Sequence, residues 1–186
     1  MAGARCGGRP FYFPDVDVRR DSRFQSFADL RGASWAYNER GSQSGYHVTL
    51  YHLARLGEVG RYFGRTFGSG GHARSLRMVL AGEVDASAID STVLEWELAR
   101  APELTARIRV IETLGPSPIP PLVVSGGRGL AVREQARAAL LALADTAKGR
   151  AILTLGGLER FAAVTDSDYD SIREMAEVAQ IAENFV

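Results

Sequence analysis

Three polar segments of this sequence each place hydroxyl, imidazole or carboxyl groups directly after a run of strand-forming residues. Each segment is also followed by a helical pattern of apolar residues. Polar groups at such a strand-to-helix turn are suited to binding a small ligand, because ligands of open α/β sheets bind beyond the carboxyl ends of the strands. The segments are Ser42–Gly45, Gly68–His72 and Asp90–Thr92.

The first segment has the chemistry of an oxyanion site. The start of a helix leaves backbone N–H groups unpaired, and the helix dipole adds partial positive charge there. The hydroxyls of Ser42 and Ser44 supply further donors, and Gly45 lets the backbone approach a ligand closely. These features predict a site for a phosphate-like anion. The alternative is that Ser42 or Ser44 only caps the helix.

The other two segments repeat this design with different groups. His72 falls in the first turn of its helix and could donate a hydrogen bond to an anion, although it could equally be satisfied within the protein. Its glycine run is not a Walker loop, since no Gly-Lys-Ser/Thr follows. Asp90 and Ser91 follow a buried strand and either face a ligand or cap the next helix.

The sequence offers little for catalysis. His47, His52 and His72 are its three histidines, and neither His47 nor His52 has an obvious carboxylate partner at helical spacing. The single cysteine, Cys6, lies in a glycine-rich start and cannot form an internal disulfide. We therefore predict no enzymatic activity, no catalytic residue, no metal site and no cofactor.

The elements that must position these groups alternate between strand and helix, which predicts an α/β fold. The expected strands are Phe11–Val18, Ala33–Tyr37, Arg61–Phe67, Val84–Ile89, Arg107–Thr113 and Leu122–Val124. The expected helices begin at Ser44 and otherwise span His72–Ala81, Ser91–Arg100, Arg133–Leu143, Lys148–Leu155 and Asp168–Asn184. Four of the seven prolines lie in Gly115–Pro121, which predicts a stiff extended crossover between two lobes.

Composition narrows the functional class. The 186 residues carry 22 basic and 22 acidic side chains, and this zero balance argues against non-specific nucleic-acid binding. With 46% hydrophobic and 24% charged residues, the chain has an ordinary soluble globular composition. No apolar run reaches the roughly 18 residues of a membrane helix. The start also lacks the apolar core of a signal peptide, so the sequence as written is not expected to be exported.

The order of the motifs resembles that of a known family. Ala28–Gly32, the Ser-x-Ser-Gly turn, the Gly-His helix start, Gly82–Ala86 and the proline-rich crossover follow one another as in the phosphate/phosphite/phosphonate-binding proteins of ABC transporters. The resemblance extends from about Tyr12 to about Met175. It implies a type II periplasmic-binding-protein fold, with one complete lobe and part of a second.

The resemblance also implies a division of the chain and a set of ligand contacts. Residues 1–22 would be a remnant of the first lobe with its crossover, 23–115 the middle lobe, and 116–186 the return crossover with the rest of the first lobe. The crossovers would lie near Asp21 and Pro116–Pro121. The matching ligand-binding positions are Tyr12, Ser42, Gln43, Ser44, Gly45, His72, Asp90 and Ser91, with Thr92 in the segment that lines the cleft.

By this resemblance the protein would bind an oxyanion such as phosphate, phosphite or a phosphonate, without catalysis, and deliver it to an ABC permease from the periplasm. If the start is genuine, a cytoplasmic location would be expected instead. A sensory or interaction module of the same fold, or a relative of the pyrimidine-precursor enzymes of thiamine synthesis, are the alternatives.

Three departures from the family pattern matter. Gln43 stands where the family usually has threonine, so an amide replaces a hydroxyl. No acidic residue lies between Gly115 and Val124 to bind an amine, so an aminophosphonate is not favoured over a plainer oxyanion. The family's initial strands and helices are also absent ahead of Tyr12. An incomplete sheet exposes an edge and apolar surface, which predicts a homodimer or poor solubility.

Overall fold

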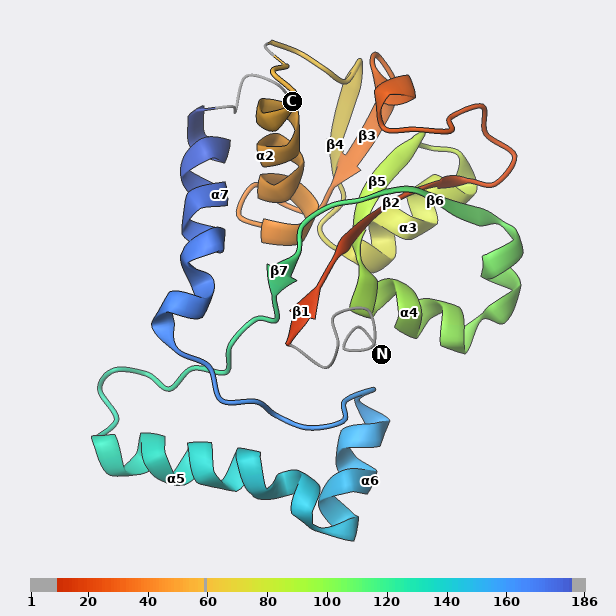
Figure 1. The fold of residues 1–186 in the computed structure, drawn as a ribbon. Coiled ribbons are helices and arrows are strands. Elements are labelled where there is room, and N and C mark those ends of the chain that lie inside the picture. The colour runs from red at the N-terminus through yellow and green to blue at the C-terminus, as the bar shows by residue number, and fades with distance from the viewer. Residues whose placement is uncertain (1–9, 59, 182–186) are drawn as a thin grey trace.

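A computed structural model describes residues 10–58 and 60–181, and it is built around one mixed five-stranded sheet (Figure 1). The strand order is β4-β3-β5-β2-β6. Strand β3 pairs in parallel with β4 and β5, whereas β2 pairs antiparallel with β5 and β6. The strands are β2 (Pro14–Arg19), β3 (Ser34–Tyr37), β4 (Arg65–Gly68), β5 (Ala86–Asp90) and β6 (Ile108–Thr113).

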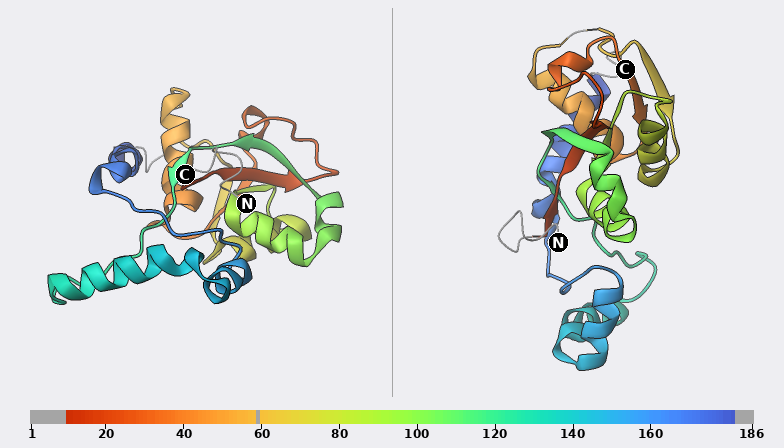
Figure 2. Two further views of the ribbon diagram at one scale, coloured as in Figure 1. Left: turned by 60° about the horizontal axis from the view of Figure 1, so that its bottom comes forward. Right: turned by 90° about the vertical axis from the view of Figure 1, so that its right-hand side faces the viewer.

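Helices cover both faces of this sheet (Figure 2). Helix α2 (Val48–Arg55) lies on one face, and α3 (His72–Ala81) and α4 (Ser91–Arg100) lie on the other. The side chains of strand β3 pack against helices on both faces of the sheet. Trp35 packs into a core with residues of α2, while its neighbour Ala36 packs into a second core with residues of α3. Consecutive strand residues point to opposite faces, so both faces of β3 are buried.

The core on the α2 face is built from stacked aromatic rings. Phe63 stacks on Trp35 with ring centroids 4.6 Å apart and an interplanar angle of 15°. Phe27 meets both rings edge-on at 6.2 Å. These rings fill the space between the sheet and α2, and so fix the helix that follows the serine-rich turn.

A short ribbon joins the sheet to the rest of the chain. Strand β1 (Phe11–Tyr12) pairs antiparallel with β7 (Ser117–Pro118), with Tyr12 opposite Ser117. The proline-rich segment is therefore one strand of a two-stranded crossover. The sequence predicts the first crossover near Asp21, and β2 runs ahead of that residue within the five-stranded sheet. Because β2 pairs within this sheet, we propose that the lobe boundary lies at about Phe13 rather than at residue 22.

After the ribbon, the chain forms α5 (Leu130–Leu141), α6 (Ala147–Leu155) and α7 (Asp170–Ile181). Helix α7 returns to pack along α2, whereas α5 and α6 lie away from the sheet (Figures 1 and 2). No helix in the described ranges is both long enough and apolar enough to span a membrane.

The predicted elements are largely confirmed, with two corrections. The Leu122–Val124 strand does not form, because no neighbouring strand offers it hydrogen-bond partners in the described part of the chain. Strand β4 starts at Arg65 rather than Arg61, because the Arg61–Gly64 stretch turns inward to bury Tyr62 and Phe63. The predicted end of the last helix, at Asn184, lies outside the described residues.

The aromatic core gives a test of this packing. Replacing the fully buried Phe63 with alanine removes its stack on Trp35 and leaves a cavity, so we expect a loss of about 3–5 kcal/mol in the free energy of unfolding, measured by urea denaturation. Phe67→Ala is the matched control, because that ring lies at the surface and should cost less than about 1 kcal/mol. Equal losses in the two variants would contradict this assignment of the core.

Candidate functional site

The parallel pairing of β4, β3 and β5 brings the three polar segments to one edge of the sheet. Parallel strands end at the same edge, so the chain leaves all three at neighbouring points. A π-helical turn, Gln43–His47, follows β3 and continues into α2. Helix α3 follows β4, and α4 follows β5 directly. Three helical N-termini therefore begin at this edge, and their partial positive charges add.

Ser44 and His72 meet there. The hydroxyl oxygen of Ser44 lies 2.7 Å from Nε2 of His72, joining the turn after β3 to the first residue of α3. The backbone N–H of Asp90 donates to Nδ1 of His72 at 3.3 Å. With Nδ1 as an acceptor, a neutral ring carries its proton on Nε2 and donates it to Ser44. The Ser44 hydroxyl then keeps its own proton for another acceptor.

His72 is held in its neutral form by its surroundings. Burial lowers the pKa of the imidazole below its usual value of 6.5, because the charged form loses hydration. The nearby carboxylate of Asp90 raises the pKa of His72 but does not cancel the effect of burial. At neutral pH the ring is therefore an uncharged hydrogen-bonding group.

Tyr12 reaches the same cluster from the crossover ribbon. Its side chain is only 3% exposed, and burial together with the Asp90 charge raises the pKa of its phenol. The nearby hydroxyls of Ser44 and Ser117 lower that pKa in part. The phenol is thus a neutral donor beside Ser44. Of the eight predicted ligand-binding residues, the structure gathers four into one cluster: Tyr12, Ser44, His72 and Asp90.

Three other predicted residues support the backbone instead. Ser42 caps the helical turn, and its hydroxyl accepts the N–H of Gly45 at 3.1 Å. Ser91 is fully buried, and its hydroxyl accepts the N–H of Phe13 at 3.1 Å. Gly45 is needed because a Cβ there would lie 2.8 Å from Cγ of Asn38. Ser42 therefore caps the helical turn, and its contact with a ligand stays a prediction.

Gln43 is directed toward the C-terminal helix. Its amide nitrogen donates to Sδ of Met175 in α7 at 3.0 Å. Its Oε1 is buried and has no hydrogen-bond partner among the described residues. The Gln43 amide therefore contacts α7.

Asn38 is a site residue that the sequence analysis missed. Its side-chain amide donates to Ser42 at 3.4 Å, and its Oδ1 accepts the hydroxyl of Ser75 at 3.3 Å. Ser75 in turn lies 2.6 Å from Ser69, in the glycine-rich turn before His72. Asn38 thus links the turn that carries Ser44 to the turn that carries His72. The available signal was an asparagine at the end of a buried strand, where its side chain can satisfy turn groups.

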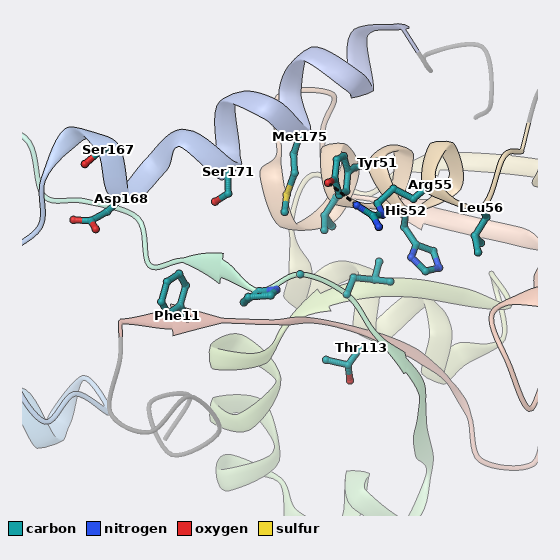
Figure 3. A pocket seen from close by; sticks show the side chains of 14 residues that line it. Phe11, Tyr51, His52, Arg55, Leu56, Thr113, Ser167, Asp168, Ser171 and Met175 are labelled. Carbon is teal, nitrogen blue, oxygen red and sulfur yellow. Dashed lines mark hydrogen bonds between the residues drawn. The ribbon is translucent and has the colours of Figure 1, made fainter.

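A separate cavity of about 740 Å³ lies between α2, α7 and the β6–β7 connection (Figure 3). Tyr51, His52 and Arg55 line it from α2, and Arg55 donates to the Tyr51 hydroxyl at 3.4 Å. Burial lowers the pKa of His52. None of the eight predicted ligand-binding residues lines this cavity. Across residues 10–58 and 60–181, no group of three or more His, Cys, Asp or Glu side chains is placed to hold a metal ion.

Comparison with known proteins shows the family of this chain. A family model described as "ABC transporter, phosphonate, periplasmic substrate-binding protein" matches residues 4–169. Binding components of this type are non-catalytic, in agreement with the prediction that the protein is not an enzyme. The comparisons give no support to a homodimer.

Solved structures confirm the predicted type II periplasmic-binding fold. A binding protein component of an ABC phosphonate transporter from Pseudomonas aeruginosa is 22% identical, with a TM-score of 0.83 over 95% of this chain and 60% of that one. PhnD1 from Prochlorococcus marinus, in complex with methylphosphonate, is 20% identical, with a TM-score of 0.80 over 90% and 66%. A Xanthomonas citri protein bound to ATP is 23% identical, with a TM-score of 0.74 over 97% and 70%. The chain therefore spans between 60% and 70% of the length of these three structures.

The tight contact at Gly45 predicts a specific cost. In Gly45→Ala the new methyl group meets the Asn38 side chain, so either the amide or the turn must move, and we expect a loss of about 1–3 kcal/mol in unfolding free energy. Gly41→Ala is the control on the same turn, since a Cβ there meets nothing within 4 Å. Thermal denaturation of both variants measures the difference, and an unaltered melting temperature for Gly45→Ala would refute the contact.

The buried neutral imidazole predicts a pH effect on stability. The pKa of His72 is lower in the folded chain than in the unfolded chain, so the unfolded chain binds more protons below about pH 6.5. Stability should therefore fall as the pH drops from about 7 to about 5. His72→Gln should show a smaller fall in urea midpoint over this range than the unmodified protein. His52, whose pKa is also lowered, accounts for a further share that His52→Gln removes.

Proposed function

Because the chain belongs to the family of periplasmic phosphonate-binding proteins of ABC transporters, we propose that its Tyr12 and Ser44 bind a phosphate- or phosphonate-like oxyanion, with His72 holding the Ser44 hydroxyl in place. The observation that carries this proposal is the 2.7 Å contact between Ser44 and His72 at an edge where three helices begin. The protein would act as the substrate-binding component of an importer, outside the cytoplasm, and pass the anion to a permease.

Two of these side chains, Ser44 and Tyr12, suit an anion because they are neutral donors, whereas the single N–H of neutral His72 is used to hold Ser44. The Ser44 hydroxyl has a proton to give once His72 has donated to its oxygen, and the Tyr12 phenol lies beside it. Neutral donors and helix dipoles stabilise a buried anion without a desolvated cation, which would itself be costly to bury. This agrees with a chain of zero net charge, since the site needs no basic surface.

Asp90 adds a constraint on the ligand. Its Oδ1 accepts the backbone N–H and the hydroxyl of Thr92, at 2.8 Å and 2.6 Å, at the start of α4. The carboxylate is also close enough to Tyr12 and His72 to raise both of their pKa values. A fully ionised phosphate there would be repelled, whereas an oxyanion that retains a proton can donate it to a carboxylate. Monoanionic phosphite or methylphosphonate fits this site better than a dianion.

The proposed division into lobes is consistent with an anion bound between two closing lobes. The ribbon of β1 and β7 would be the hinge, and the five-stranded sheet with its helices would be the middle lobe. The methylphosphonate complex of the Prochlorococcus marinus relative supports a small phosphonate as the ligand. The remaining segment, after the ribbon, would belong to the first lobe, which closes on the ligand from the other side.

Removing the Ser44 hydroxyl tests this proposal. Ser44→Ala should weaken binding of methylphosphonate by about 10–100-fold, because a hydrogen bond to a charged group is lost while the fold is kept. Isothermal titration calorimetry with methylphosphonate, phosphite, phosphate and aminoethylphosphonate measures the effect. Ser171→Ala, an exposed serine on α7 that lines the separate cavity, is the matched control and should bind as the unmodified protein does. Equal affinities in the two variants would place the anion elsewhere.

A further inference from the structure

The cavity between α2 and α7 carries opposite charges toward its two ends. Its volume of about 740 Å³ lies within the range of small-molecule sites. Figure 3 shows Asp168 and Phe11 toward one end, and Arg55 and Leu56 toward the other. Asp168 and Arg55 supply the formal charges of the lining at neutral pH, because burial lowers the pKa of His52. A ligand that fills the cavity therefore meets a negative group at one end and a positive group at the other.

Asp168 is positioned by protein contacts that leave part of its carboxylate for a ligand. Its Oδ2 accepts the backbone N–H of Thr165 at 2.6 Å and the Thr165 hydroxyl at 2.9 Å. These contacts belong to a capping box ahead of α7, and they lower the pKa of the carboxyl, which is ionised at neutral pH. Oδ1 accepts no hydrogen bond from the described residues, so it can accept one from a bound cation.

Arg55 is held in a comparable way at the other end. Its guanidinium donates to the Tyr51 hydroxyl at 3.4 Å and lies 5.9 Å from the centre of the Tyr51 ring. The Tyr51 hydroxyl in turn donates to Glu174 in α7 at 3.2 Å. An arginine has five N–H donors, so this arrangement leaves donors that can bind a carboxylate. Glu174 itself does not line the cavity, so the charge that a ligand meets at this end is that of Arg55.

The wall between the two charges is apolar. Leu114 and Pro116 line it from the β6–β7 connection, and Phe11 lines it from β1. Val48 and Met175 line it from α2 and α7. A polar group buried against such a wall without a hydrogen-bond partner would be unfavourable. The middle of a matching ligand is therefore a hydrocarbon chain.

The separation of the charges limits the length of the ligand. Glu174, which accepts the Tyr51 hydrogen bond, marks the level of Arg55 along α7. Asp168 lies six residues before Glu174 in the sequence. At about 1.5 Å per helical residue, this corresponds to roughly 9 Å along the helix. An α-amino acid carries both charges on one carbon and cannot reach both groups, whereas a linear ω-amino acid with several methylene groups can.

We propose that this cavity is a second ligand site, which takes a linear ω-amino acid with an apolar chain. The ligand's carboxylate binds Arg55, its ammonium group binds Asp168, and its methylene chain packs against the apolar wall. The cavity is distinct from the anion site. Phe11 lines the cavity, whereas Tyr12, the next residue of β1, lies beside Ser44, because consecutive strand residues point to opposite sides.

Isothermal titration calorimetry of the full chain with four small probes tests this site. The main probe is 8-aminooctanoate, and octanoate and octylamine each lack one of its charges. We expect 8-aminooctanoate to bind at least about threefold more tightly than either, because each loses one charge-assisted contact. The short probe 4-aminobutanoate should bind more weakly as well, because it cannot reach both charges. Equal affinities for the four probes would overturn the proposal.

Two substitutions assign the ends of the ligand. Arg55→Gln should weaken octanoate binding at least about threefold and leave octylamine binding unchanged, and Asp168→Asn should do the reverse. Both side chains are exposed, and asparagine keeps an acceptor for Thr165, so the urea midpoints should stay as in the unmodified chain. Arg77→Gln, at an exposed arginine of α3 outside the cavity, is the matched control. An equal loss for both probes in either variant would contradict the assigned ends.

The Ser44→Ala variant separates this site from the anion site. It should bind 8-aminooctanoate as tightly as the unmodified chain does, because Ser44 does not line the cavity. A loss of 8-aminooctanoate affinity in Ser44→Ala would place the probe in the anion site and overturn the second site. No phosphonate is present in these titrations, so their result does not depend on whether the proposed oxyanion function is correct.

Discussion

Parallel pairing of β3 with both β4 and β5 is the constraint on which the candidate site depends. Tyr37 pairs with Gly68, and Ala36 pairs with Ser87, so the three strands end in register at one edge. An antiparallel neighbour would have carried its turn to the opposite edge and separated Ser44 from His72. The register itself is fixed by burial. A slip of one residue would exchange the faces of Trp35 and Ala36 and displace the turns by about 3.3 Å, more than a hydrogen bond tolerates.

Hydrogen bonds between the turns after β3 and β4 then fix the relative position of these two turns. Asn38 is buried at the end of β3 and connects to Ser42 on one side and to Ser75 on the other. An isolated buried amide would be costly, but here each polar end has a partner, so the network holds both turns at low cost. The contact between Ser44 and His72 depends on this network, because each residue belongs to one of the two linked turns.

The sequence predicted the parts of the site that local rules control. The positions of Ser44, His72 and Asp90 follow from strand-to-helix turns, and hydrophobic periodicity locates such turns well. The roles of Gln43 and Ser91 could not be predicted, because their partners, Met175 and Phe13, lie far away in the sequence. The same limit explains the expected strand at Leu122–Val124. Its residues have the right propensity, but a strand exists only where a neighbour pairs with it.

The ribbon of β1 and β7 lies next to the proposed anion site. Tyr12 and Ser117 lie opposite each other in the ribbon, and the phenol of Tyr12 is close enough to the Ser44 hydroxyl for that hydroxyl to lower its pKa. A ligand that accepts the Ser44 or Tyr12 proton must therefore rearrange a contact that ties the ribbon to the sheet. Because β1 and β7 are hydrogen-bonded to each other, a change at the anion site that moves one of these strands should move the other as well. Helix α7 is also connected to this region. Gln43, in the turn after β3, and Tyr51, in α2, both donate hydrogen bonds to residues of α7. The residues of and after this turn thus contact both the ribbon and α7, and binding there biases their position only as far as the ligand prefers one arrangement over the other.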